Sequence, residues 1–251
     1  MNPRRFRGSC LVLVSLIASA ASPAPGEEIV VKNDSMTDAS SVTPCICFTP
    51  GDIPAAWLTS PVPGKIVGVQ VFWRSGLGGA PDTQETAIRI YDGGTFPTPG
   101  SVLQNDGAVD AEVVAPLLSD GVLNEFRFLD QAETIPLSVP VSKGQVFAVG
   151  LEIFNQSSGG GSFTPSLPFD TDGCESDASA VFVFDQNDWF EACGLGTSGD
   201  WVIRAIIEWD SSIPATSHWG LAVLALVLLT AGTVVTLRHG KTQSPLGRQR
   251  A

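Results

Sequence analysis

The residues best suited to chemistry include an acidic segment around a glycine. Four carboxylates lie within 170–177, namely Asp170, Asp172, Glu175 and Asp177. Oxygen ligands at nearly alternate positions of a turn suit Ca²⁺. The alternation breaks at Cys174 and no helical pattern flanks the segment, so it is not an EF-hand loop. The pattern predicts either a calcium site or a solvated acidic loop, and Ca²⁺ is the one cofactor to consider.

Aromatic side chains form the second candidate site. Tyr91 adjoins a turn rich in Pro and Gly, and Trp189 lies in a polar segment that also holds Asp185, Asn187 and Asp188. Exposed rings in the loops of β domains stack on sugar rings, and neighbouring Asp and Asn side chains bind the hydroxyls. These residues therefore predict contact with polysaccharide. The alternative is that the rings pack against the core or against a disulfide.

Cysteines provide the third kind of chemistry. Four of them lie in the segment 27–212, at Cys45, Cys47, Cys174 and Cys193. An even number in an oxidising compartment indicates two disulfides. A bond from Cys45 to Cys47 closes a tight ring across one residue, so we expect these two cysteines to be linked to Cys174 and Cys193 instead. Such loops exceed about 100 residues, and each bridge would stabilise the fold by about 4–5 kcal/mol.

Catalysis is restricted by the histidines. The chain has only two, His218 and His239, and neither lies in the segment 27–212. This excludes Ser-His-Asp and Cys-His catalysis and imidazole-bound metals from that segment. It contains neither a Gly-x-Ser-x-Gly motif nor a glycine-rich phosphate loop. Glycoside hydrolysis by paired carboxylates is the remaining enzymatic alternative, and we expect a protein that is not an enzyme.

Charge is distributed unevenly along the chain. The 251 residues carry a formal charge of −12, from 14 basic and 26 acidic side chains. All 26 acids lie between Glu27 and Asp210, together with only seven of the bases, so this stretch has a formal charge of −19. Phosphate binding needs clustered Lys and Arg. The acidic stretch therefore argues against nucleic acid as a partner.

The two ends read as targeting segments. Three arginines, a short apolar run at 10–17 and the small residues 18–20 indicate a secretory signal peptide over 1–21. The segment 219–237 is uncharged and long enough to cross most of a bilayer as a helix. A basic tail over 238–251 follows it and is expected in the cytoplasm. The precursor is thus predicted to be a single-pass membrane protein with its N-terminal body outside.

The junction before this apolar segment carries a more specific pattern. Its residues are Ile213, Pro214, Ala215, Thr216, Ser217, His218, Trp219 and Gly220. Together with the apolar segment and Arg238, they resemble the bacterial IPTL-CTERM protein-sorting domain. The family pattern has Thr, Leu or Val, and Glu where this chain has Ala215, Thr216 and His218. The resemblance covers about the last 30 residues. It implies an exosortase-like membrane transpeptidase as partner, which would cut near 213–220 and pass the body to an acceptor in the envelope. The alternative is a permanent membrane anchor.

The elements that position these residues read as strands. Residues 66–74, 122–129 and 145–154 alternate between apolar and polar side chains. In 66–74 the apolar side of the alternation is Val67, Val69, Val71 and Trp73. Shorter strand-like runs are 29–32, 86–91, 112–117, 180–185 and 201–209. About eight strands without a helical period predict an all-β fold, an antiparallel β-sandwich resembling a jelly roll, over 27–212.

These observations combine into one expectation. The chain is predicted to be an exported, non-catalytic protein of the cell envelope or cell surface, structural or adhesive, and delivered by its C-terminal sorting segment. The first alternative is a module that binds polysaccharide, with or without calcium. The second is a carboxylate-based glycoside hydrolase.

Overall fold

The computed structural model describes residues 26–107, 109–158 and 164–209. Within these ranges the chain is all-β, its sheets are antiparallel, and its helices are three short 3-10 turns at Ala39–Ser41, Phe184–Gln186 and Cys193–Leu195. None of the described residues belongs to a helix that is long and apolar enough to cross a membrane. The predicted signal peptide, sorting motif, membrane helix and basic tail lie outside the described residues.

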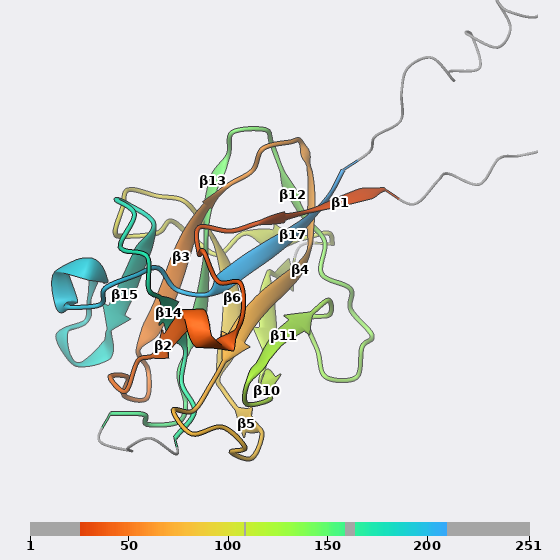
Figure 1. The fold of residues 1–251 in the computed structure, drawn as a ribbon. Coiled ribbons are helices and arrows are strands. Elements are labelled where there is room, and N and C mark those ends of the chain that lie inside the picture. The colour runs from red at the N-terminus through yellow and green to blue at the C-terminus, as the bar shows by residue number, and fades with distance from the viewer. Residues whose placement is uncertain (1–25, 108, 159–163, 210–251) are drawn as a thin grey trace, which may run out of the picture.

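Two sheets make up most of the body (Figure 1). The five-stranded sheet has the order β1–β17–β4–β11, and β12 also pairs with β4. Its strands are β1 (Glu27–Val31), β17 (Ile203–Trp209), β4 (Gly64–Trp73), β11 (Val122–Phe126) and β12 (Val139–Val141). The six-stranded sheet has the order β16–β15–β3–β13–β6–β9. Its strands are β16 (Asp188–Glu191), β15 (Ser179–Val183), β3 (Ile53–Thr59), β13 (Val146–Glu152), β6 (Ala87–Asp92) and β9 (Glu112–Val114).

Segments that connect the strands of the two large sheets form three short two-stranded sheets. They pair β2 (Val42–Pro44) with β14 (Pro168–Asp170), β5 (Thr83–Gln84) with β10 (Leu117–Leu118), and β7 (Gln104–Asn105) with β8 (Val109–Asp110). Each of the eight predicted strand runs overlaps an observed strand. The central strand β3 was missed, because it is buried on both faces, does not alternate and contains Pro54. The strand β16 was missed because its segment is polar.

The core lies between the two large sheets. Inward side chains from both sheets form one cluster, which includes Leu58, Trp73, Phe147, Leu151 and Trp201. In β4 the predicted alternation holds from Val69 to Trp73 but not at Val67, because the register with β17 shifts at this point. The irregularity turns Val67 outward and places Ile66 in the core instead.

The two ends of the body leave it side by side. Glu27 at the start of β1 pairs with Trp209 at the end of β17, and both strands lead out of the body at the same end (Figure 1). The connection from β3 to β4 lies at this end as well, because Lys65 pairs with Glu208. The opposite end carries the starts of β3 and β17. We call these the exit end and the far end of the body.

Candidate functional site: an aromatic groove on the six-stranded sheet

The outer face of the six-stranded sheet carries large rings on a floor of small residues. Outward positions on neighbouring strands hold Ala55, Ala148, Gly150 and Ala180, and the rings of Trp57 and Tyr91 pack among them. A Cβ at Gly150 would lie 3.3 Å from Cε2 of Tyr91 and 2.8 Å from Cγ2 of Ile53. Glycine is therefore needed here, because a Cβ would collide with the Ile53 side chain and crowd the Tyr91 ring.

Trp57 and Trp189 make the ring contacts that connect this cluster. Trp57 contacts Phe96 edge-on with ring centroids 5.2 Å apart, and Trp189 with centroids 6.0 Å apart. Trp189 also contacts Tyr91 at 6.3 Å and Phe182 at 5.5 Å. Nε1 of Trp57 donates a hydrogen bond to the carbonyl of Gly93 at 2.9 Å, which fixes the indole. Edge-on pairs of this kind add stability beyond the area that they bury.

The sequence predicted Tyr91 and Trp189 as one site, and the structure brings them into contact. Tyr91 is only 8% exposed, so its ring packs on the sheet and is not free to stack on a ligand. This agrees with the alternative prediction that the rings pack against the body of the protein. Trp189, Phe96 and Phe182 are half-buried. Trp57, Phe96 and Phe182 were not predicted as site residues, since their positions give no sign of a shared face until the strand order is known.

A groove of about 480 Å³ opens beside these rings. Its lining residues are Trp57, Thr59, Gly93, Gly94, Thr95, Phe96, Val146 and Asp177. Asp177 was predicted as a calcium ligand, and the structure places it in this groove. Among the described residues that line the groove, Asp177 is the one with a carboxylate. Asn187 and Asp188 are exposed, and they do not belong to the lining.

One wall of the groove is a tight hairpin after β6. Thr95 and Thr98 exchange backbone hydrogen bonds of 3.0 and 2.8 Å, which holds Phe96 between them. Gly94 has φ of +58°, and a Cβ there would lie 2.5 Å from the carbonyl oxygen of Thr98. Only glycine fits this position. The Pro- and Gly-rich turn seen in the sequence therefore positions Phe96 over Trp57.

A charged network lies next to the rings on the same face. Arg89 donates to Glu112 at 2.9 Å and also to Glu152. Burial alone would lower the pKa of Arg89, but the hydrogen bonds to these two carboxylates outweigh it and raise the pKa. Burial raises the pKa of the Tyr91 hydroxyl, against the effect of nearby Arg89. The two glutamates thus serve as partners of a guanidinium.

Carboxylates with a raised pKa lie elsewhere. Burial raises the pKa of Glu85, whose oxygens accept from the backbone of Phe154 at 2.6 Å and of Asn155 at 3.1 Å. Burial likewise raises the pKa of Asp170 and Asp200. None of the three lines the groove.

The acidic segment is divided between the interior and the surface. Asp170 is fully buried on β14, where it accepts from the backbone of Ser35 at 2.7 Å and of Asp200 at 2.8 Å. Asp172, Glu175 and Asp177 are exposed. Within the described residues no group of three or more His, Cys, Asp or Glu is arranged to hold a metal ion. Calcium binding by this segment stays a prediction.

The disulfide connectivity predicted from the sequence is wrong. Cys45 is bonded to Cys47, and Cys174 is bonded to Cys193. The Cα atoms of the first pair are 5.2 Å apart, within the usual range, because the chain bends after β2 and brings them together. The N-terminal segment is instead held by the pairing of β2 with β14. The backbone N–H of Cys45 also donates a hydrogen bond of 3.2 Å to the carbonyl of Leu167.

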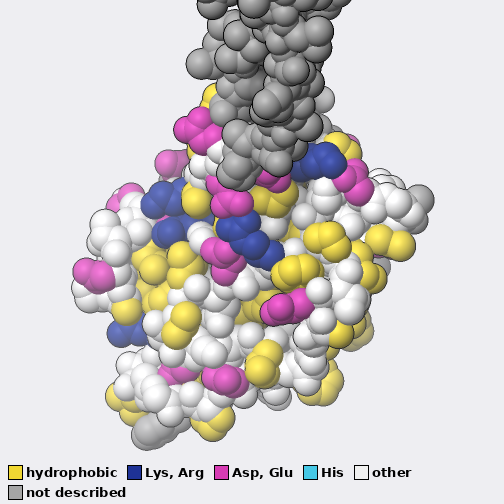
Figure 2. Space-filling view, turned by 90° about the vertical axis from the view of Figure 1, so that its right-hand side faces the viewer, with side chains coloured by type: hydrophobic (Ala, Val, Ile, Leu, Met, Phe, Trp, Pro, Cys, Tyr) yellow, Lys and Arg dark blue, Asp and Glu magenta, His cyan; other side chains and the backbone are white. Residues whose placement is uncertain are grey.

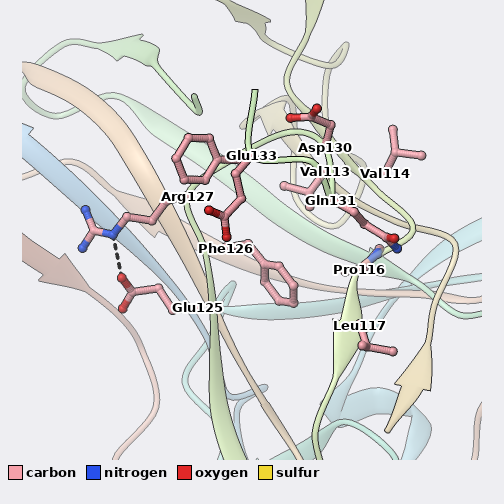
Figure 3. Close-up of a pocket in the computed structure, with 11 residues that line it drawn as sticks. Val113, Val114, Pro116, Leu117, Glu125, Phe126, Arg127, Asp130, Gln131 and Glu133 are labelled. Carbon is pink, nitrogen blue, oxygen red and sulfur yellow. Dashed lines mark hydrogen bonds and ion pairs between the residues drawn. The ribbon is translucent and has the colours of Figure 1, made fainter. Parts of the chain in front are cut away.

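Another pocket, of about 370 Å³, lies between the edge strands β9 and β11 (Figure 3). Phe126, Val113 and Leu117 line it together with charged residues. Arg127 is paired with Glu125 at 2.6 Å and with Glu28 at 2.6 and 2.9 Å. The space-filling view shows basic, acidic and hydrophobic side chains mixed on this side of the body (Figure 2). The guanidinium of Arg127 in this pocket is therefore already paired with carboxylates.

Comparison of the chain with protein-family models, with curated proteins and with solved structures found no match.

Proposed function

We propose that the chain is an exported, non-catalytic protein of the cell envelope or cell surface, with a jelly-roll-like β-sandwich body. In this proposal the segment 213–220 directs an exosortase-like transpeptidase to the protein, and the segment 219–237 holds the precursor in the membrane. Two features of the described residues support export. The body contains two disulfides, which persist in oxidising compartments. Its ends leave at one place, as suits a body tethered beside a membrane.

The proposed role of the body is adhesion to polysaccharide, and the aromatic groove is the observation that carries it. The partly exposed ring of Phe96 offers a flat apolar face, and Trp189 extends the ring cluster behind Trp57. Asp177, Thr59 and Thr95 add acceptors and donors along the same groove. Sugar rings have apolar C–H faces and hydroxyls at their edges, so both kinds of contact are used at once.

Charge narrows the class of polysaccharide. The stretch from Glu27 to Asp210 has a formal charge of −19, and the groove itself contains Asp177. Like charges across an interface suppress a wrong partner. We therefore propose a neutral polysaccharide rather than one rich in uronate or phosphate. Thr59 and Val146 place the groove near the exit end of the body, which favours a polymer of the producing cell's own envelope.

A glycan array with the full-length protein in detergent tests the adhesive role. We expect Phe96→Ala to weaken binding by about 2- to 13-fold, because contacts of an aromatic ring contribute about 0.5–1.5 kcal/mol. Trp189→Ala and Asp177→Ala should also weaken it. Phe154→Ala is the matched control, since this ring is 66% exposed and does not line the groove. Binding to no glycan, or equal loss in the control, would contradict the proposal.

Mass spectrometry of the C-terminus tests the sorting role. Protein isolated from the producing cell should end near 213–220 if the transpeptidase processes it. An intact 238–251 tail in all mature molecules would show a permanent anchor instead. His218→Glu, which restores the residue usual in the family pattern, should increase the processed fraction if recognition is limiting.

A further inference from the structure

The far end of the body carries a second groove, which is apolar and contains a disulfide. Its volume is about 320 Å³, and both Cys45 and Cys47 line it. Phe48, Val181 and Trp201 form a buried floor, with exposures of 2%, 5% and 0%. Leu195, which is 51% exposed, stands on the rim.

The bond between Cys45 and Cys47 contributes little to stability. It joins residues with a sequence separation of two. In the chain-entropy model, closing so short a loop stabilises by only about 1.6 kcal/mol. β2 is already held by its pairing with β14. The bond can therefore open and close while the two large sheets stay folded.

The two cysteines differ in exposure. Cys45 is buried and Cys47 is exposed, so an incoming thiolate meets Cys47 first. The residues adjoining this bridge in sequence, Pro44, Ile46 and Phe48, are uncharged, and Asp52 is the one carboxylate among the described residues that line the groove. By contrast, Cys174 and Cys193 have Asp172, Glu175 and Glu191 close by in sequence, and these repel an anion. Repulsion of an incoming thiolate is thus expected to be weaker at the first bridge than at the second.

The groove also selects the kind of thiol. Its floor and rim would hold an apolar side chain next to the attacking cysteine. Asp52 lines the groove, but its carboxylate already accepts from Thr49 at 2.7 and 2.9 Å and from Phe184 at 3.0 Å. The buried hydroxyl of Thr197 has no hydrogen-bond partner among the described residues, and a bound peptide could supply one.

We propose that the bond between Cys45 and Cys47 is a thiol–disulfide exchange site for cysteine-containing polypeptides with apolar flanks. A substrate thiolate attacks Sγ of Cys47, and a new bond joins the two sulfurs. The bond from Cys45 to Cys47 breaks, its electron pair goes to Sγ of Cys45, and that sulfur takes a proton from water. A second substrate thiol then attacks the substrate sulfur of the mixed disulfide and releases Cys47 as a thiolate. The substrate loses two electrons, which the site gains.

The test uses two blocked tripeptides, Phe-Cys-Phe and Asp-Cys-Asp, with the full-length protein. Free thiols are alkylated at intervals and located by peptide mapping. We expect Phe-Cys-Phe to open the bond from Cys45 to Cys47 faster than the bond from Cys174 to Cys193, by about tenfold or more. Phe-Cys-Phe should also open the bond from Cys45 to Cys47 faster than Asp-Cys-Asp does. Leu195→Asp should reduce this difference between the two peptides. Leu117→Asp should not, and it is a matched control because Leu117 is 53% exposed and lies outside the groove.

Single-cysteine variants test the direction of attack. These variants lack the bond from Cys45 to Cys47, so they are offered the disulfide-linked dimer of Phe-Cys-Phe, which supplies the bond to be exchanged. With Cys45→Ser, the Cys47 thiolate attacks the peptide disulfide, one peptide leaves as a thiolate, and the mixed disulfide of Cys47 should accumulate because no second cysteine resolves it. With Cys47→Ser, the buried Cys45 should capture the peptide at least about tenfold more slowly. Equal rates at the two bridges, equal behaviour of Leu195→Asp and Leu117→Asp, or equal capture by the two single-cysteine variants would each overturn the proposal. The polysaccharide groove plays no part in any of these results.

Discussion

The two disulfides should contribute unequally to the free energy of unfolding. Their sequence separations are 19 and 2 residues. Loop closure in the unfolded chain then gives about 3.3 kcal/mol for the bridge from Cys174 to Cys193 and about 1.6 kcal/mol for the bridge from Cys45 to Cys47. The difference of about 1.7 kcal/mol comes only from loop length. In a body of this size it corresponds to a difference in Tm of about 3–7 °C.

Two double variants isolate each bridge. Cys45→Ala/Cys47→Ala keeps the longer loop, and Cys174→Ala/Cys193→Ala keeps the shorter one. Cys10, which lies outside the described residues, is replaced by serine in both. Each variant is unfolded in urea in its oxidised form and in its reduced form. The difference between these two free energies measures one bridge, because the lost packing of the replaced sulfurs is the same in both forms and cancels.

The outcome separates the observed connectivity from the crossed one. With the observed bridges, oxidation should stabilise the first variant about twice as much as the second. If Cys45 and Cys47 were instead bonded to Cys174 and Cys193, each variant would lose both bridges and oxidation would stabilise neither. That result would refute the connectivity. Equal, non-zero stabilisation of the two variants would refute the argument from loop length.

Three further predictions concern the rings, a buried acid and calcium. Gly150→Ala should destabilise the fold by about 1–3 kcal/mol and change the near-ultraviolet circular dichroism, since the added Cβ meets Tyr91 and Ile53; an unchanged melting curve would contradict the packing described here. Burial raises the pKa of Glu85 in the folded state above its unfolded value near 4.5, so the folded protein holds the proton more tightly. The contribution of this residue to the free energy of unfolding therefore falls as the pH rises from the unfolded pKa through the folded pKa. The free energy of unfolding of Glu85→Gln, measured in urea relative to that of the natural protein, should therefore be higher at pH 7 than at pH 4. A difference that does not depend on pH would count against the burial of Glu85. If segment 170–177 binds calcium, saturating Ca²⁺ should raise Tm by mass action and chelator should lower it; no change with either would end the calcium reading.

The local elements follow from the sequence because they depend on neighbours along the chain. Alternation of apolar residues placed strands at β4, β11 and β13, since a half-buried strand shows its two faces in turn. The Pro- and Gly-rich segment after Tyr91 forms the expected turn because its residues restrict the backbone directly. Where no such local pattern exists, as in β3, the strand was not predicted, because its burial on both faces depends on β13 and β15.

The composition of the acidic stretch and its lack of histidine were determined by the sequence alone, and they bound the chemistry that the body can perform. Tertiary structure decided which residues meet. Strand order brings Trp57, Tyr91 and Trp189 together from three distant segments, and it buries the Tyr91 ring that the sequence left open. It also decided the disulfides, because the bend after β2 sets the distance between Cys45 and Cys47. Spacing along a chain fixes local conformation, whereas contacts between segments depend on how the sheets pair and pack.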